Sequence, residues 1–262
     1  MNRFLLSALL ITSSAFAQER LVVVGGGNIP REAASQFAEW AQGQQAKVLI
    51  IPWATKKTQE YSGNIKKAVE PFTKSDAFTI APTAPLSAED KAKFLKELEQ
   101  ATGVFFTGGD QARIAKVLED EEIKSALDKK YRSGTPFGGT SAGTAIMSKV
   151  ALMEEKKLPL GPLDLENGSP DVTTGPGLCF LPSNVIVDQH FIIRNREARL
   201  RIMMLNNPGS IGVGIDEDEA LIVENGIGKA VGPSAVVVLT PDDKTLLKKG
   251  EKYDLTNRKR VK

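Results

Sequence analysis

The chain has 262 residues, and its 34 lysine and arginine residues against 32 aspartate and glutamate residues give a formal net charge of +2. This near-neutral balance excludes a broad basic surface of the kind that binds nucleic acid or a membrane. The single cysteine, Cys179, excludes an intramolecular disulfide; its apolar neighbours predict a buried thiol rather than a nucleophile.

The first 17 residues are predicted to be a secretory signal peptide. Arg3 supplies the positive start, residues 4–11 form a short apolar core, and Ala15-Phe16-Ala17 has the small residues of a cleavage site. The apolar core is too short to be a membrane anchor, and no cysteine follows the cleavage site to carry a lipid. We therefore expect an exported protein, periplasmic or extracellular, with one α/β domain over residues 18–262.

Short apolar runs alternate with amphipathic segments along the mature chain, as in repeated βα units. Such units predict a mostly parallel sheet with helices on both faces. Helices are expected at 31–42, 59–70, 90–101 and 112–130 and from residue 142 onwards. Strands are expected at 20–24, 48–51, 75–81, 103–107, 185–187 and 210–215, with closing strands at 220–223 and 235–239.

Two stretches interrupt this alternation. The turn Gly25-Gly26-Gly27-Asn28 lacks the usual phosphate-binding patterns, so its glycines are expected to let a neighbouring loop approach the strand end. Between residues 151 and 177 the pattern dissolves into a long loop rich in glycine and proline. Loops of this length are usually functional or mobile, and we interpret this one as a rim or lid of the site.

The segment Gly139-Thr140-Ser141-Ala142-Gly143 has the Gly-x-Ser-x-Gly pattern of a nucleophile elbow. In such a turn between a strand and a helix, glycines avoid steric clashes while the serine hydroxyl is held out at the strand end. A turn of small residues that contains an ordinary, non-catalytic serine would have the same sequence pattern. The rest of the sequence therefore has to decide between the two interpretations.

A serine nucleophile needs a base, and this chain has one histidine, His190. It follows the apolar run 185–187, just beyond a predicted strand, where catalytic groups of α/β sheets gather. The acid that would orient the imidazole is expected in Asp216-Glu217-Asp218-Glu219, at the end of another strand. Spacing alone does not choose among these carboxylates.

Two further groups stand at predicted strand ends. Gly108 and Gly109 offer backbone N–H donors across from Ser141, while Asp110 is a suitable N-cap for the next helix. After His190 come three arginines, at positions 194, 196 and 199. They form either a salt-bridged surface helix or a set of guanidinium groups that bind the carboxylates of an acidic substrate.

Four motifs in this order resemble the cyanophycinases, serine peptidases related to the aspartyl dipeptidase peptidase E. The motifs are Phe105–Gln111, Gly138–Gly143, Val187–Phe191 with the following arginines, and Gly212–Glu217, and the resemblance covers roughly residues 21–239. It implies a class I glutamine-amidotransferase-like, flavodoxin-like three-layer fold, usually as a homodimer. No metal ion or cofactor is expected.

The resemblance also implies roles for individual residues. Ser141 matches the nucleophile, His190 the base and Glu217 the acid, with the N–H groups of Gly109 and Ala142 as oxyanion donors. Thr144 departs from the family, which often has alanine there. The positions that resemble the lining of the substrate site are Gln111, Asp188, Gln189, Arg194, Arg196 and Arg199.

The implied substrate is cyanophycin, a poly-aspartate with an arginine on each side-chain carboxyl, cleaved to β-Asp-Arg dipeptides. A dipeptidase acting on N-terminal Asp-Xaa peptides, as in peptidase E, is the first alternative. The second is a non-catalytic periplasmic binding protein on the same fold.

Overall fold

The computed structural model describes residues 18–155 and 172–261, so the predicted signal peptide lies outside the described residues. Five strands form a parallel core, in the order β1, β5, β4, β2, β3. Their bounds are β1 Arg20–Val24, β2 Val48–Ile51, β3 Phe78–Ile80, β4 Gly103–Phe106 and β5 Phe137–Thr140. Beyond β1 the same sheet continues with the antiparallel strands β10 Ala220–Glu224, β11 Ile227–Val231, β14 Lys252–Asp254 and β15 Lys259–Val261.

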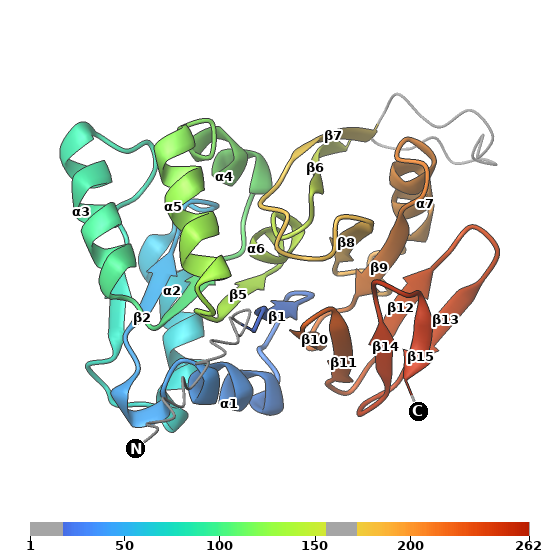
Figure 1. Cartoon of the computed structure of the whole chain (residues 1–262), viewed down its shortest axis with the longest axis horizontal. Coiled ribbons are helices and arrows are strands. Elements are labelled where there is room, and N and C mark those ends of the chain that lie inside the picture. The colour runs from blue at the N-terminus through green and yellow to red at the C-terminus, as the bar shows by residue number, and fades with distance from the viewer. Residues whose placement is uncertain (1–17, 156–171, 262) are drawn as a thin grey trace, which may run out of the picture.

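Helices cover both faces of the parallel core, because successive strand residues point to opposite sides (Figure 1). Val22, Val24 and Ile50 pack with α1 Arg31–Trp40 and α2 Thr58–Val69. Leu21, Val23 and Leu49 face the other way, in the cluster that includes α3 Ala88–Gln100 and α5 Glu121–Arg132. Two short 3-10 helices, Gly43–Gln45 and Glu70–Phe72, follow α1 and α2.

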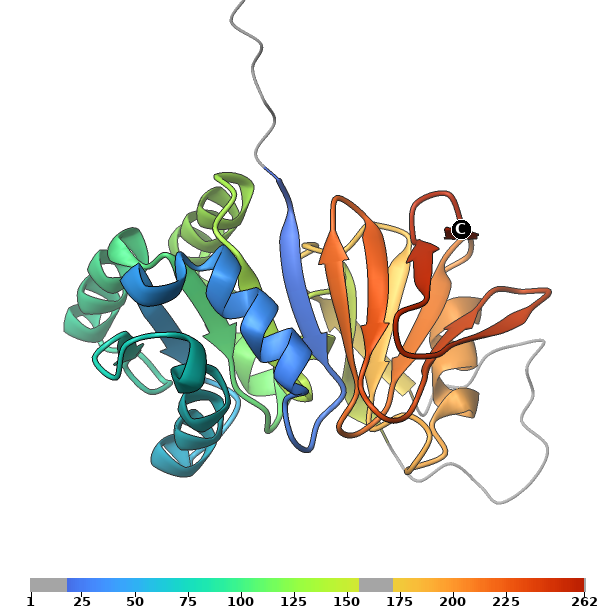
Figure 2. The same ribbon diagram turned by 90° about the horizontal axis from the view of Figure 1, so that it is seen from below.

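A second sheet of four strands packs beside the parallel core (Figure 2). Its strands are β8 Val185–Gln189, β9 Ile211–Ile215, β12 Val236–Leu239 and β13 Lys244–Leu247, of which β8 and β9 are parallel. One face contributes Val187 and Val213 to the same apolar cluster as Leu21. The other face packs against α7 Glu197–Leu205.

The predicted α/β class with a mostly parallel core sheet is confirmed, and the structure corrects three local predictions. The single helix expected at 112–130 is wrong: α4 Gln111–Val117 and α5 are separate, because Asp120 caps α5 by accepting the N–H groups of Glu122 and Ile123. Cys179 is partly exposed, although its neighbours Leu178 and Phe180 are buried.

The third correction concerns the long loop. Its two ends pair as the antiparallel strands β6 Val150–Glu155 and β7 Val172–Pro176, and residues 156–171 lie outside the described part of the chain. Among the described residues, none of the helices combines the length and apolarity needed to span a membrane.

Candidate active site

Ser141 stands at the sharp turn between β5 and the short helix α6 Ala142–Ala145, with a positive φ of 52°. The glycines around it are sterically required. A Cβ on Gly139 would lie 2.2 Å from the carbonyl oxygen of Gly143, and one on Gly143 would lie 2.5 Å from that of Phe106. This is the geometry of a nucleophile elbow.

Thr144 fixes this turn to β1. Its fully buried hydroxyl accepts the N–H of Val24 at 2.9 Å and lies 2.7 and 2.8 Å from the carbonyl oxygens of Val24 and Gly139, to one of which it donates. The Ser141 N–H also donates to the Val24 carbonyl, at 3.0 Å. Thr144, which departs from the family pattern, therefore links the elbow to β1.

His190 directly follows β8 and lies against Ser141, with 2.8 Å between the serine Oγ and Nε2. On its other side Nδ1 donates to Oε1 of Glu217. The His190 backbone N–H donates to the carbonyl of Gly25, and the ring lies so close to Gly26 that a Cβ there would be 2.2 Å from Cε1. The expectation that the glycine turn lets a neighbouring loop approach is confirmed.

Among the neighbouring acids, Glu217 is the one that contacts the imidazole. Asp216 accepts the N–H groups of Ile192 and Ile193 at 3.1 and 3.0 Å, and Asp218 accepts that of Asn28 at 2.6 Å. These two carboxylates hold loops, whereas Glu217 orients the histidine ring.

The electrostatic surroundings favour neutral His190. Burial is the main cause that lowers the pKa of His190, and the nearby charge of Arg194 adds to it, although the hydrogen bond to Glu217 acts in the opposite direction. Arg194 also donates to Glu217 Oε1 at 3.2 Å. A neutral imidazole between a serine hydroxyl and a carboxylate can accept the serine proton and transfer it later.

The backbone of Gly108 and Gly109 lies beside Ser141. A Cβ on Gly108 would be 3.3 Å from that of Ser141, and Gly109 has a φ of 134°, which favours glycine. Asp110 caps α4 through the Ala112 N–H, at 2.9 Å, as predicted. Ala142 follows Ser141 directly, so the backbone of both turns lies next to the serine.

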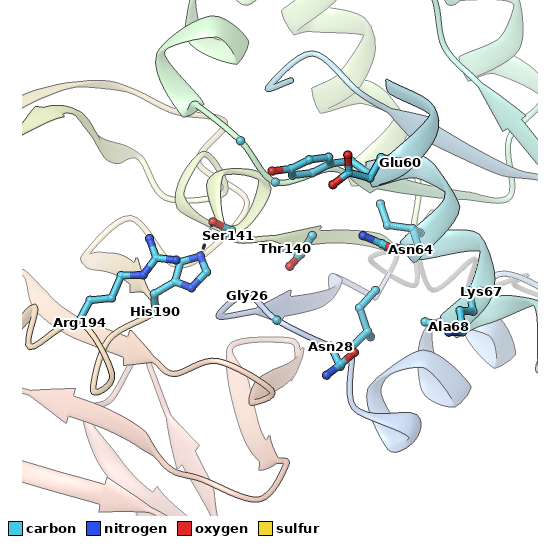
Figure 3. A pocket seen from close by; sticks show the side chains of 16 residues that line it. Gly26, Asn28, Glu60, Asn64, Lys67, Ala68, Thr140, Ser141, His190 and Arg194 are labelled. Carbon is cyan, nitrogen blue, oxygen red and sulfur yellow. Dashed lines mark hydrogen bonds between the residues drawn. The ribbon is translucent and has the colours of Figure 1, made fainter. Parts of the chain in front are cut away.

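A cavity of about 600 Å³ opens over these groups, within the range of about 300–1,000 Å³ typical of small-molecule sites. Figure 3 shows His190 and Arg194 on one side of Ser141 and side chains of α2 on the other. Within residues 18–155 and 172–261, no cluster of three or more His, Cys, Asp or Glu side chains is placed to bind a metal ion.

Comparison with known proteins agrees with this geometry. The sequence profile of Peptidase family S51 matches residues 21–230. The chain belongs to peptidase family S51. It is therefore a serine peptidase, and cyanophycinases are among its curated relatives.

The cyanophycinase of Trichormus variabilis is 31% identical over 231 residues, which span 86% of this chain and 74% of the relative. Peptidase E of Haemophilus influenzae is 26% identical over 153 residues, or 54% of this chain and 63% of the relative. The crystal structure of a peptidase from an acI-B1 actinobacterium matches with a TM-score of 0.66 at 22% identity, covering 91% of this chain and 97% of that one. The S51 peptidase thus has the expected class I glutamine-amidotransferase-like fold.

The six residues expected to line the substrate site lie in different places in the structure. All six lie in the described part of the chain, and of them only Arg194 lines the cavity. Gln189 is buried behind the site, with its Oε1 3.4 Å from Ser141 Oγ and accepting from Arg196 at 2.7 Å. Gln111 is also buried, at the start of α4.

Asp188 and Arg199 lie in the interior and do not line the cavity. Their side chains are each only 2% exposed, and they form a bidentate ion pair in which Arg199 Nε donates to Asp188 Oδ2 at 2.7 Å. Asp188 lies on the face of the second sheet that α7 covers, so its charge is compensated there by Arg199 of that helix.

The helix α2 contributes to the site in a way that the sequence does not predict. Glu60, Asn64 and Lys67 line the cavity at spacings of four and three residues, which place them on one helix face. This polar stripe is visible in the sequence, but nothing local indicates that it faces the elbow.

Proposed function

We propose that this S51 peptidase hydrolyses cyanophycin to β-Asp-Arg dipeptides with Ser141 as nucleophile, His190 as base and Glu217 as acid. The observation that carries the proposal is the 2.8 Å contact between Ser141 Oγ and His190 Nε2, with Glu217 bound to the other ring nitrogen. The similarity to cyanophycinases over most of the chain supports the substrate.

In this mechanism Ser141 Oγ attacks a backbone carbonyl of the substrate while His190 Nε2 takes the hydroxyl proton. Glu217 stabilises the imidazolium through its hydrogen bond at Nδ1. The tetrahedral intermediate collapses when His190 gives that proton to the leaving amine, which leaves an acyl-enzyme on Ser141. Water, deprotonated by His190, then attacks the ester and releases the second product.

The negative oxygen of the intermediate would accept hydrogen bonds from the backbone N–H groups of Gly109 and Ala142. Donors of this kind contribute most when they are fixed before the reaction. Support for fixed donors comes from Gly109, whose ideal Cβ position lies 2.2 Å from the carbonyl oxygen of Ala54, so the turn is tightly packed.

Export, which is part of the same proposal, rests on the sequence of residues 1–17. An exported enzyme would degrade polymer released by other cells. Fractionation of cells that express the full chain, with mass determination of the mature N-terminus, tests this point. The homodimer rests on the resemblance to the family and is tested by light scattering of the purified protein.

The deciding experiment incubates purified protein with insoluble cyanophycin granules and, separately, with Asp-Xaa dipeptides, and identifies products by mass spectrometry. Release of β-Asp-Arg from granules by the wild type, and none by Ser141→Ala, is expected. Cleavage of the dipeptides alone would favour the peptidase E activity, which the similarity to the Haemophilus influenzae enzyme makes the second candidate. A Ser141 that is unreactive to a serine-directed phosphonate would contradict both.

A further inference from the structure

The wall of the cavity opposite His190 is formed by α2. Glu60, Tyr61 and Asn64 line it from the first turns of the helix, and Lys67 lies further along. Tyr61 is close to the reacting group, because a Cβ on Gly108 would be 3.6 Å from Tyr61 Cε1 and 3.3 Å from the Ser141 Cβ. A substrate held at Ser141 therefore reaches this wall.

The charges around the cavity are unevenly distributed. Among the described residues that line it, Glu60 carries the only carboxylate, whereas Arg194 and Lys67 are cationic. Figure 3 shows Glu60 and Arg194 on opposite sides of Ser141. A positively charged substrate group has therefore one acidic partner in this cavity, and negatively charged groups have two basic ones.

We infer that Glu60 and Tyr61 form the subsite for the guanidinium of the substrate arginine. This inference rests on the proposed function, in which each repeat unit carries one guanidinium and one free carboxylate. A carboxylate binds a guanidinium through two parallel hydrogen bonds, and an aromatic ring accepts its flat face. Glu60 and Tyr61 both line this cavity from the first turns of α2, so a guanidinium that enters the cavity meets a carboxylate and an aromatic ring on the same wall.

The neighbouring lysines do not block this subsite. Lys57 Nζ pairs with Glu60 at 3.2 Å, but the two side chains are 69% and 58% exposed, and such a pair is easily exchanged for a better partner. Lys67 is seven residues from Glu60, or about 10 Å along the helix axis. That separation leaves Lys67 free to bind the carboxylate of another repeat unit.

The test compares two soluble synthetic oligomers, one of β-Asp-Arg units and one in which citrulline replaces arginine. Citrulline has the shape of arginine but a neutral urea group in place of the guanidinium. Steady-state kinetics give KM and kcat for both oligomers, and calorimetry in a Ser141→Ala background gives Kd. We expect the wild type to prefer arginine by about tenfold, mainly in KM and Kd, as for a charge-assisted hydrogen bond combined with a cation–π contact.

Glu60→Gln is expected to reduce this preference to about twofold or less, because the amide keeps the shape but lacks the charge. Tyr61→Leu is expected to reduce it in the same direction, whereas Tyr61→Phe retains it. Glu70→Gln is the matched control: Glu70 follows α2, pairs with Lys66, and is not among the residues that line the cavity, so this variant keeps the wild-type preference.

Two results would overturn the inference while leaving the proposed function intact. One is a wild type that cleaves both oligomers equally well, and the other is a Glu60→Gln variant that keeps the tenfold preference. A wild type that cleaves neither oligomer nor cyanophycin granules would refute the proposed function, and the arginine subsite with it.

Discussion

Gly26→Ala is expected to disable the site without unfolding the protein. Gly26 lies in the turn after β1 with a φ of 123°, directly against the imidazole of His190. The added methyl group would stand 2.2 Å from Cε1 and 2.6 Å from Nε2, the atom that contacts Ser141. The perturbation therefore acts on the ring nitrogen that would take the serine proton.

The magnitude follows from these distances. Ordinary contact begins at 3.4 Å, so the ring must retreat by about 1.2 Å, the difference from 2.2 Å. Its hydrogen bonds to Ser141 and Glu217 cannot both survive such a shift. A displacement of about 1 Å in a catalytic group costs roughly 100-fold in rate, and the strained backbone adds about 1–3 kcal/mol of destabilisation.

Gly43→Ala provides the matched control. Gly43 also has a positive φ, 56°, but nothing lies within 4 Å of the position its Cβ would take. Both variants should lose stability, measured as Tm, because each forces alanine into a conformation that favours glycine, and Gly26→Ala should lose more because its methyl group also clashes with the imidazole. Only Gly26→Ala should lose about 100-fold in kcat, measured on β-Asp-Arg oligomers.

A folded Gly26→Ala protein with kcat within about threefold of wild type would refute this reasoning. It would mean that the imidazole does not need the position seen against Gly26. Equal losses of activity in both variants would also refute it, since the effect would then come from general destabilisation.

Three further predictions concern charged side chains. In Arg194→Gln we expect the acid limb of the pH profile of kcat/KM to move to higher pH. Burial is the main cause that lowers the pKa of His190, and the charge of Arg194 lowers it further. Without that charge the pKa rises, so the inactive imidazolium persists to higher pH. Arg199→Ala leaves the buried carboxylate of Asp188 without its ion-pair partner and should lower the free energy of unfolding in urea, measured without substrate, by about 3–5 kcal/mol. Removing a residue that served only substrate binding would not lower it. Burial raises the pKa of Glu219, so the neutral carboxyl stabilises the fold and this stabilisation is lost as pH rises through the raised pKa. Glutamine stays neutral at every pH. The Tm of Glu219→Gln should therefore exceed that of the wild type by more at about pH 8 than at about pH 5.

The features that the sequence predicts well are those whose cause is local. The elbow at Ser141 is recognisable because its pattern is short and contiguous, and because a Cβ on Gly139 would clash with the carbonyl oxygen of Gly143 in the same turn. The parallel core follows from regular alternation of apolar runs and amphipathic helices. The antiparallel strands after residue 220 have no helices between them. The pairings of β10 with β1 and of β11 with β14 join segments that are distant in the chain.

Two other differences between sequence and structure arise where the same residues suit more than one environment. Asp188 and Arg199 resemble exposed ligands in the sequence, but β8 and α7 bring them together in the interior. The break between α4 and α5 depends on whether Asp120 caps a new helix or stays solvated inside a longer one. In both cases the same residues suit two structures, and only tertiary contacts select one.

The three consecutive glycines after β1 explain how groups from two sheets meet in one site. Ser141 is held by the first sheet, whereas His190 and Glu217 follow β8 and β9 of the second. The turn of residues 25–27 contacts the segments that carry His190 and Glu217. The Gly25 carbonyl accepts the His190 N–H, the Gly26 carbonyl accepts the Asp218 N–H next to Glu217, and a Cβ on Gly25 would lie 2.0 Å from the carbonyl oxygen of Asp216. Any side chain in this turn would push the base and its acid away from the serine, so the close approach of the sheets, rather than a bound phosphate, accounts for these glycines.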